Sequence, residues 1–246
     1  MTKIYHYTKL GTAIEHILPK LSLRTSGLDK MNDPKENQPW AFGGRNIDYK
    51  SWYPESYNND THSEHQKKLG LEIKASCQAL CFVKDKPKKG YLNEIMWAHY
   101  AENHQGICIE LDKDRFIQEN IKLLSDYAFE SVNYGIHERV SMIASNGTRR
   151  EEIDRIVKVN YKELFYKKSR DWKTENEVRL LTFNRDQLFL SIKESLTGLY
   201  LGLSFPYNYL PSIDYLIDTE QTKVYELFYE DGKIKKMEPV KGRLKS

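Results

Sequence analysis

The hydrophobic and polar residues of this chain alternate with different periods, and each period predicts an element. Over residues 3–7 the chain alternates with period two and is rich in β-forming residues, which is typical of a strand. The apolar residues that follow recur at helical spacing until Pro19, so we predict a short helix capped by Thr8. Two further strands are expected over 21–25 and 75–83, the second of them buried.

Between those two strands, residues 26–66 form a long polar stretch with turn-forming groups such as Asn32-Asp33-Pro34 and Gly43-Gly44. A loop of this length in a compact domain is usually functional or mobile. We therefore expect a long loop over 26–66 that acts either as a lid over a substrate or as a partner surface. It carries several aromatic residues suited to either role: Trp40, Trp52, Tyr53 and Tyr57.

In the second half of the chain, capping residues predict where three helices begin. Asn93 and Asp112 each precede a helical pattern, and Thr148 with Glu151 three residues later is a capping box for the longest helix. Helices and strands are interspersed without a regular βαβ repeat, so we expect a single α+β domain over 1–246 with a largely antiparallel sheet. The remaining strands are predicted over 106–111 and 198–203, with a hairpin over 222–239 around Asp231-Gly232.

The most informative stretch, 172–183, places charged residues at every second position. In a strand, Glu175, Glu177 and Arg179 would project from one side of the sheet. Two carboxylates beside a guanidinium are suited to holding a polar ligand or to stabilising positive charge at a reacting carbon. The alternative is an exposed edge strand whose Glu177 and Arg179 form a surface ion pair that contributes only ~0–1 kcal/mol.

Composition limits the classes of function that this chain can serve. Its 246 residues are 39% hydrophobic and 30% charged, with a formal net charge of +3, which indicates neither nucleic-acid nor membrane binding. No leader or long apolar run is seen, so we expect a soluble, cytoplasmic protein. Cys77, Cys81 and Cys108 are predicted to be reduced core thiols, since their spacing does not suit a zinc site.

Other polar residues are candidates for a site, and each also has a structural explanation. His6 would share a strand face with Ile4 and Thr8, and it either looks into a cleft or covers the core. His99 and Tyr100 lie on the face of a predicted helix that should be apolar, so each needs a polar partner if it is buried. A further group, Asn32, Asp33 and Glu36, either serves a ligand or completes a turn.

At these residues the chain resembles a bacterial family catalogued as a domain of unknown function. Several motifs in one order carry this resemblance across nearly the whole chain, but the family supplies no reaction. They are Tyr5-His6-Tyr7, Asn32-Asp33-Pro34-Lys35-Glu36, Met96-Trp97-Ala98-His99-Tyr100, Gly106-Ile107-Cys108-Ile109-Glu110, and Lys168-Ser169-Arg170-Asp171-Trp172 through Arg179.

The chain also resembles, more loosely, the ADP-ribosyltransferases, whose split antiparallel sheet holds a His or Arg first, a Ser or Tyr midway and a Glu late. In this chain Tyr5-His6-Tyr7-Thr8, then His99 or Tyr100, and finally Glu175-x-Glu177 would fill these places. The resemblance implies NAD as a substrate, with ADP-ribose transferred to an unknown macromolecule or NAD hydrolysed, as in a bacterial toxin or a phage-defence effector.

This second resemblance also implies roles for individual residues. Glu177, Glu175 and His6 would be catalytic, with His6 hydrogen-bonded to the nicotinamide ribose and Glu177 stabilising an oxocarbenium-like transition state. No metal is needed. The NAD-binding residues would be Tyr7, Thr8, Asn32, Asp33, Glu36, His99, Tyr100 and Arg179.

Two other functions compete with the transferase. The aromatic residues of 26–66 also fit a non-catalytic ligand-binding or sensing domain. The second competitor is a metal-dependent nuclease, in which Asp33, Glu36, Glu175 and Glu177 would bind a hard cation. However, restriction-type nucleases place a lysine after the second acid, and here Arg179 stands two residues beyond Glu177.

Overall fold

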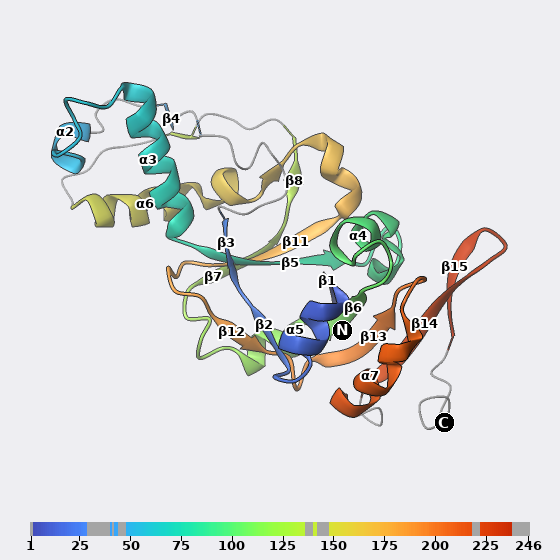
Figure 1. Ribbon diagram of the computed structural model, residues 1–246. Helices are drawn as coiled ribbons and strands as arrows, with labels where there is room; N and C mark the ends of the chain where they lie inside the picture. The colour runs from blue at the N-terminus through green and yellow to red at the C-terminus, as the bar shows by residue number, and fades with distance from the viewer. Residues whose placement is uncertain are drawn as a thin grey trace.

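A computed structural model describes residues 2–28, 40, 42–43, 48–135, 140–141, 148–217 and 222–237. These residues form a mixed α+β fold, in which an open and largely antiparallel sheet carries helices on both faces (Figure 1). The α+β class expected from the sequence is confirmed. Within the described ranges, no helix has both the length and the apolar character that crossing a bilayer requires.

The main sheet places the N-terminal strand near its middle. In the described residues, eight of its strands follow one path and β3 (Ser26–Gly27) pairs with β5 off that path. Neighbouring strands are antiparallel except for β13 and β14, which are parallel. In order across the sheet they are β15 (Lys233–Met237), β14 (Lys223–Glu230), β13 (Leu196–Leu201), β6 (Ile107–Asp112), β1 (Lys3–Thr8), β5 (Gln78–Lys84), β11 (Glu177–Thr182) and β7 (Tyr127–Ser131).

Helices and short strands complete the fold. The capping signals at Asn93, Asp112 and Thr148 are confirmed, since each side chain accepts a hydrogen bond from the first turn of its helix. The helical elements are α1 (Leu10–Thr12), η1 (Ala13–Ile17), α2 (Tyr49–Trp52), α3 (His62–Ala75), η3 (Gly90–Leu92), α4 (Glu94–Tyr100), α5 (Lys113–Glu119), α6 (Arg149–Phe165), η4 (Arg170–Glu175), η5 (Tyr207–Tyr209) and α7 (Leu210–Leu216). The short strands are β2 (Ser22–Arg24) with β12 (Phe189–Ser191), β8 (Asn133–Tyr134) with β10 (Lys167–Lys168), and β4 (Phe42–Gly43) with β9 (Val140–Ser141).

The sheet opens between β1 and β5. All six residues of β1 pair with β6, whereas only Ile4 and Tyr5 pair with β5, opposite Lys84 and Val83. At its other end, β5 pairs with β3 instead, with Ala79 opposite Ser26 and Gln78 opposite Gly27. The sheet therefore separates into a half that contains β1, β6 and β13 and a half that contains β5, β11 and β7.

The two faces of the sheet carry different cores. Residues directly opposite one another in antiparallel strands share a face, so Tyr5, Val83 and Glu177 project to one side. We call this side the α4 face, because α4 covers Tyr5 and Val83 there, while α3 and α6 cover Leu181 at its other end. The opposite side, the α5 face, packs Ile4 and its apolar neighbours against η1, α5 and α7.

The prediction of a loop over 26–66 is wrong in part. Helix α2 and the first turn of α3 lie in this stretch, and Thr61 with Glu64 forms the same kind of capping box as Thr148 with Glu151. The helical pattern of α3 is hard to recognise because its buried face includes a histidine and a glycine. The predicted turn residues Asn32, Asp33 and Glu36 lie outside the described residues.

Two glycines lie where backbone segments near the end of α4 approach closely, Gly106 beside Thr8 of β1 and Gly202 beside His104. A Cβ atom on Gly202 would lie 2.0 Å from the backbone oxygen of His104, and one on Gly106 would lie 2.2 Å from that of Thr8. By contrast, a Cβ atom on Gly198 would have no neighbour closer than 3.5 Å. The backbone at Gly106 and Gly202 therefore has no room for a larger residue.

We expect Gly202→Ala to lower the free energy of unfolding by about 2 kcal/mol, because backbone atoms must move to admit the methyl group. Urea unfolding measures this change. The matched control is Gly198→Ala inside β13, where the methyl group makes ordinary contacts. Equal effects of the two substitutions would contradict the packing that we describe.

Candidate functional site

The acidic stretch that stands out in the sequence forms a buried ion cluster on the α4 face. Lys168 Nζ lies 2.7 Å from Glu175 Oε2 and 2.7 Å from Glu177 Oε2, so it bridges the two carboxylates. Arg179 Nε donates to Glu177 Oε1 at 2.8 Å. All four side chains are at most 3% exposed. Two negative charges are therefore balanced by two positive charges inside the protein.

A residue with a left-handed backbone conformation, Asn176, lies between the two glutamates and brings their carboxylates together. Glu175 ends η4, and Asn176 has a φ of 52°, so the strand begins only at Glu177. The prediction that Glu175 belongs to the strand is wrong, yet its carboxylate still reaches Lys168 on β10. Tyr100 of α4 donates to Glu175 Oε1 at 2.8 Å and so joins the helix to the cluster.

The strand that carries Glu177 and Arg179 is not an exposed edge. Strand β11 lies between β5 and β7, and all six of its residues are buried. The guanidinium of Arg179 also donates to the carbonyl of Phe165 at the C-terminal end of α6, where a positive charge is favourable. The interpretation of Glu177 and Arg179 as a surface ion pair is therefore wrong.

The charge of Glu177 is fixed by its neighbours. Burial raises the pKa of this carboxyl, but the charges of Arg179 and Lys168 and a hydrogen bond from Arg179 outweigh burial and lower the pKa to about 2. The thiol of Cys81 lies beside this cluster, and burial together with the Glu177 charge raises its pKa. Glu177 is therefore an anion at neutral pH, and Cys81 stays a thiol.

His6 does not join this cluster. It follows Tyr5, which shares a face with Glu177, so the imidazole projects to the α5 face, where its ring lies 5.8 Å from that of Phe82. His6 Nδ1 lies 3.1 Å from the carbonyl oxygen of Cys81. The sheet thus separates His6 from Glu177, although both lie against Cys81 of β5.

His6 instead lines a cavity of about 450 Å³ where the sheet opens, which we call the split pocket. Its basic side chains come from β1, η1, the turn after η1 and β2, and none of its lining residues within the described ranges carries a carboxylate. The lining is His6, Thr12, His16, Ile17, Lys20, Ser22, Leu23, Arg24, Ser26, Ala79, Leu80, Cys81 and Phe189.

The surroundings of His6 determine its protonation state. Burial lowers the pKa of the imidazole, and the Cys81 carbonyl only partly opposes this effect, so His6 is neutral at neutral pH. A neutral imidazole that faces a carbonyl at Nδ1 carries its proton there, which we assign from this contact. Nε2 is then a hydrogen-bond acceptor.

The other predicted site residues are dispersed. Tyr7 belongs to the α4-face core, where its hydroxyl donates to the Gly90 carbonyl at 2.5 Å, and Thr8 is buried at the end of β1. His99 is exposed on α4 and has its ring 5.9 Å from that of Trp172. Of the predicted binding residues that the structure describes, only Tyr100 and Arg179 lie with the Glu175 and Glu177 carboxylates.

Sequence reasoning missed Lys168 and three basic side chains of the split pocket, His16, Lys20 and Arg24. Lys168 stands inside the Lys-Ser-x-x-Trp motif, and this motif was the available signal for it. Lys20 and Arg24 carry no comparable signal, because an exposed lysine or arginine beside a short strand is common on any protein surface. The three cysteines are free thiols, as predicted.

The structure describes two of the four acids of the predicted nuclease site, Glu175 and Glu177, whereas Asp33 and Glu36 lie outside the described residues. Within the described residues, no group of three or more His, Cys, Asp or Glu side chains is positioned to hold a metal ion. Glu175 and Glu177 are already neutralised by Lys168 and Arg179, so their oxygens are not directed at a vacant site.

Comparison with known proteins gives one match. The family model described as "Protein of unknown function (DUF2971)" matches residues 96–180, which extend from α4 into β11 and include Glu175, Glu177 and Arg179. No curated protein matches the chain, and no solved structure matches it. Over this segment the chain is therefore similar to a family of unknown function, in agreement with the first resemblance found in the sequence.

Proposed function

We propose that this protein binds NAD, or a nucleotide of the same class, in the split pocket. The observation that carries the proposal is a cavity of about 450 Å³ lined by His6, His16, Lys20 and Arg24, in which the described lining contains no acid. Its volume falls in the range of about 300–1,000 Å³ that is typical of small-molecule sites. The charges of Lys20 and Arg24 attract an anion.

The chemistry of the lining fits the parts of a nucleotide. Lys20 and Arg24 offer the ammonium and guanidinium groups that bind phosphate. Phe189 is 54% exposed and lies opposite Arg24 in the pairing of β2 with β12, so an aromatic base can stack on it at the pocket mouth. His6 Nε2 can accept a hydrogen bond from a ribose hydroxyl.

A transferase that cleaves NAD is our second candidate, and the order of the strands favours it. The first strand, with His6, and the late strand, with Glu177, flank the same strand β5, in keeping with the resemblance to ADP-ribosyltransferases. Cleavage by Glu177 would require this carboxylate to leave Lys168 and Arg179 and to reach a ligand on the other side of the sheet. Binding needs no such rearrangement, so we place it first.

The test of the proposal is the affinity for NAD, measured by isothermal titration calorimetry. We expect the double variant Lys20→Gln with Arg24→Gln to bind NAD at least about tenfold more weakly, since each lost charge-assisted hydrogen bond contributes about 1.5 kcal/mol or more. Lys233→Gln, on the exposed hairpin strand β15, removes a charge outside the pocket and should leave the affinity unchanged. Equal binding by all three proteins, or no binding of NAD, ADP-ribose or ATP by the unaltered protein, would refute the proposal.

A separate measurement addresses the second candidate. If the protein cleaves NAD through Glu177, nicotinamide should be released in excess chelator, because this reaction needs positioning and charge stabilisation alone. Binding of NAD without release of nicotinamide would support the ligand-binding function and exclude the transferase function.

A further inference from the structure

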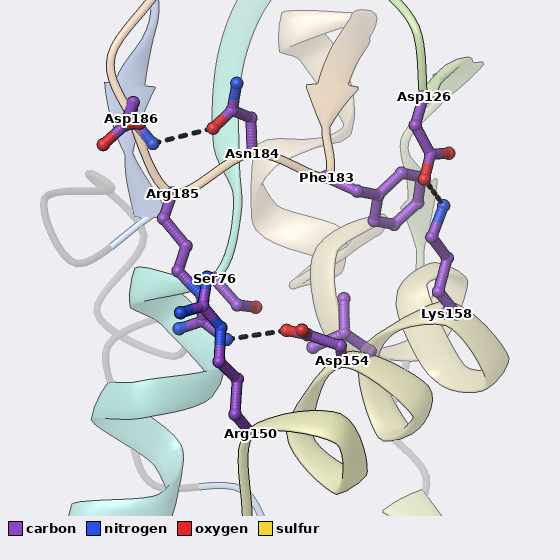
Figure 2. A pocket seen from close by; sticks show the side chains of 10 residues that line it. Ser76, Asp126, Arg150, Asp154, Lys158, Phe183, Asn184, Arg185 and Asp186 are labelled. Atoms are coloured by element: carbon purple, nitrogen blue, oxygen red, sulfur yellow. Dashed lines mark hydrogen bonds and ion pairs between the residues drawn. The ribbon is translucent and has the colours of Figure 1, made fainter.

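A second cavity, of about 360 Å³, lies at the far end of β11, where the strand leaves the sheet (Figure 2). It is bounded by the first three turns of α6, by Ser76 after α3 and by the loop 183–186. We call it the α6 pocket. Its charged lining residues are Asp126, Arg150, Asp154, Lys158, Arg185 and Asp186.

The α6 pocket differs in charge from the split pocket. Three acids and three bases line it, so its net charge is zero, whereas the split pocket is basic. A ligand with a net charge gains little from such a lining, because every attraction is offset by a repulsion. A ligand that carries one charge of each sign gains from both.

Two of the charge pairs are already formed within the protein. Lys158 pairs with Asp126 and lies 3.7 Å from the ring centre of Phe183, and Arg185 donates to Asp154 Oδ1 at 2.6 Å. In Figure 2 these pairs lie on opposite sides of the pocket, with Phe183 beside the first. These contacts hold the walls of the pocket.

Arg150 is the third basic residue of the α6 pocket, and it belongs to neither of these two pairs. It lies four residues before Asp154, on the same face of α6, yet Asp154 pairs with Arg185 instead. No hydrogen bond or ion pair of the Arg150 side chain is found within the described part of the chain. Figure 2 shows its guanidinium beside that of Arg185, near Ser76. Two neighbouring guanidiniums repel each other, and an anion between them removes this repulsion.

We infer that the α6 pocket binds a small zwitterion of the α-amino acid class. Its carboxylate accepts from the guanidinium of Arg150 beside that of Arg185, and its ammonium group donates to Oδ2 of Asp154, the oxygen that Arg185 leaves open. The ligand side chain lies toward Val157 and Phe183. This site is separate from the split pocket and does not depend on the proposed function.

The experiment measures the affinity of the full chain for each of the twenty common α-amino acids by isothermal titration calorimetry. We expect at least one to bind with a Kd below about 1 mM, an affinity that a few charge-assisted hydrogen bonds can supply. For that amino acid, the N-acetyl form lacks the ammonium charge and the amide form lacks the carboxylate. Each should bind at least about tenfold more weakly.

Two variants assign the binding to this pocket. Arg150→Gln should lower the affinity for the zwitterion at least about tenfold. Arg150→Lys should restore only part of this affinity, since a lysine lacks the planar guanidinium that binds a carboxylate through two hydrogen bonds. Arg150 is exposed, so neither variant should unfold the protein. Arg115→Gln, an exposed position on α5, is the control for the loss of one positive charge. Unchanged binding in Arg150→Gln, equal binding of the N-acetyl form, or no binding of any amino acid would overturn the inference.

Discussion

Replacing Lys168 with methionine is expected to lower the free energy of unfolding by about 3–5 kcal/mol at neutral pH, the usual cost of removing one partner from a buried ion pair. Methionine has a similar length, so the change tests charge rather than volume. The loss is large because Lys168 bridges two carboxylates that are both within 2.7 Å of its Nζ atom. Without the ammonium group, Glu175 and Glu177 face each other with only Arg179 to balance them. Urea unfolding at pH 7 measures the change.

The control for this prediction is an ion pair at the surface. Lys158 pairs with Asp126, and these side chains are 44% and 51% exposed, so Lys158→Met should cost less than about 1 kcal/mol. The double variant Lys168→Met with Glu175→Gln should recover part of the stability lost by Lys168→Met alone, since it removes one of the two opposed charges. A loss below 1 kcal/mol for Lys168→Met would mean that the cluster is not formed in solution.

Local signals in the sequence were sufficient to place several helix starts and the C-terminal hairpin. The caps at Asn93, Asp112 and Thr148 predicted helix starts because a capping side chain and the backbone that it serves lie within three residues. The hairpin turn at Asp231-Gly232 is equally local, because both residues adopt the positive φ that such a turn needs. These interactions depend on neighbours in sequence alone.

The environment of β11 was not predictable in the same way. Charged residues at every second position are compatible with an exposed edge and with a buried strand that has partners for its charges. The difference is made by β5 and β7, which flank β11, and by Lys168, which reaches back from β10. Which strands become neighbours is decided by the topology of the whole sheet, and no residue within β11 specifies it.

The position of His6 illustrates a second limit. A strand pattern assigns His6 to one face, with Ile4 and Thr8, but it does not say which of the two faces will hold the acids. The registers Tyr5↔Val83 and Val83↔Glu177 put His6 on the opposite side. A shift of one residue in either pairing would have placed both groups together.

Glu177→Gln is expected to lower the free energy of unfolding by about 3 kcal/mol at neutral pH. The folded pKa of about 2, against 4.5 in the unfolded chain, corresponds to a stabilisation of this size for the anion. The resemblance to ADP-ribosyltransferases assigns Glu177 a catalytic role, but its surroundings give it a structural one. Because Glu177 is 3% exposed and paired with both Lys168 and Arg179, the glutamine instead leaves a positive charge uncompensated in the interior.

The dependence on pH identifies the charge of Glu177 as the cause. A carboxyl whose pKa is lower in the folded protein stabilises it above pH 4.5, and this stabilisation is lost as the pH falls from 4.5 to about 2. A neutral glutamine has no such dependence. The difference in unfolding free energy between the unaltered protein and Glu177→Gln should therefore be constant from pH 5 to 7 and shrink toward zero near pH 2. Urea unfolding across this range measures it. A difference that stays the same at every pH would show that glutamine acts through packing or hydrogen bonding and not through the lost charge.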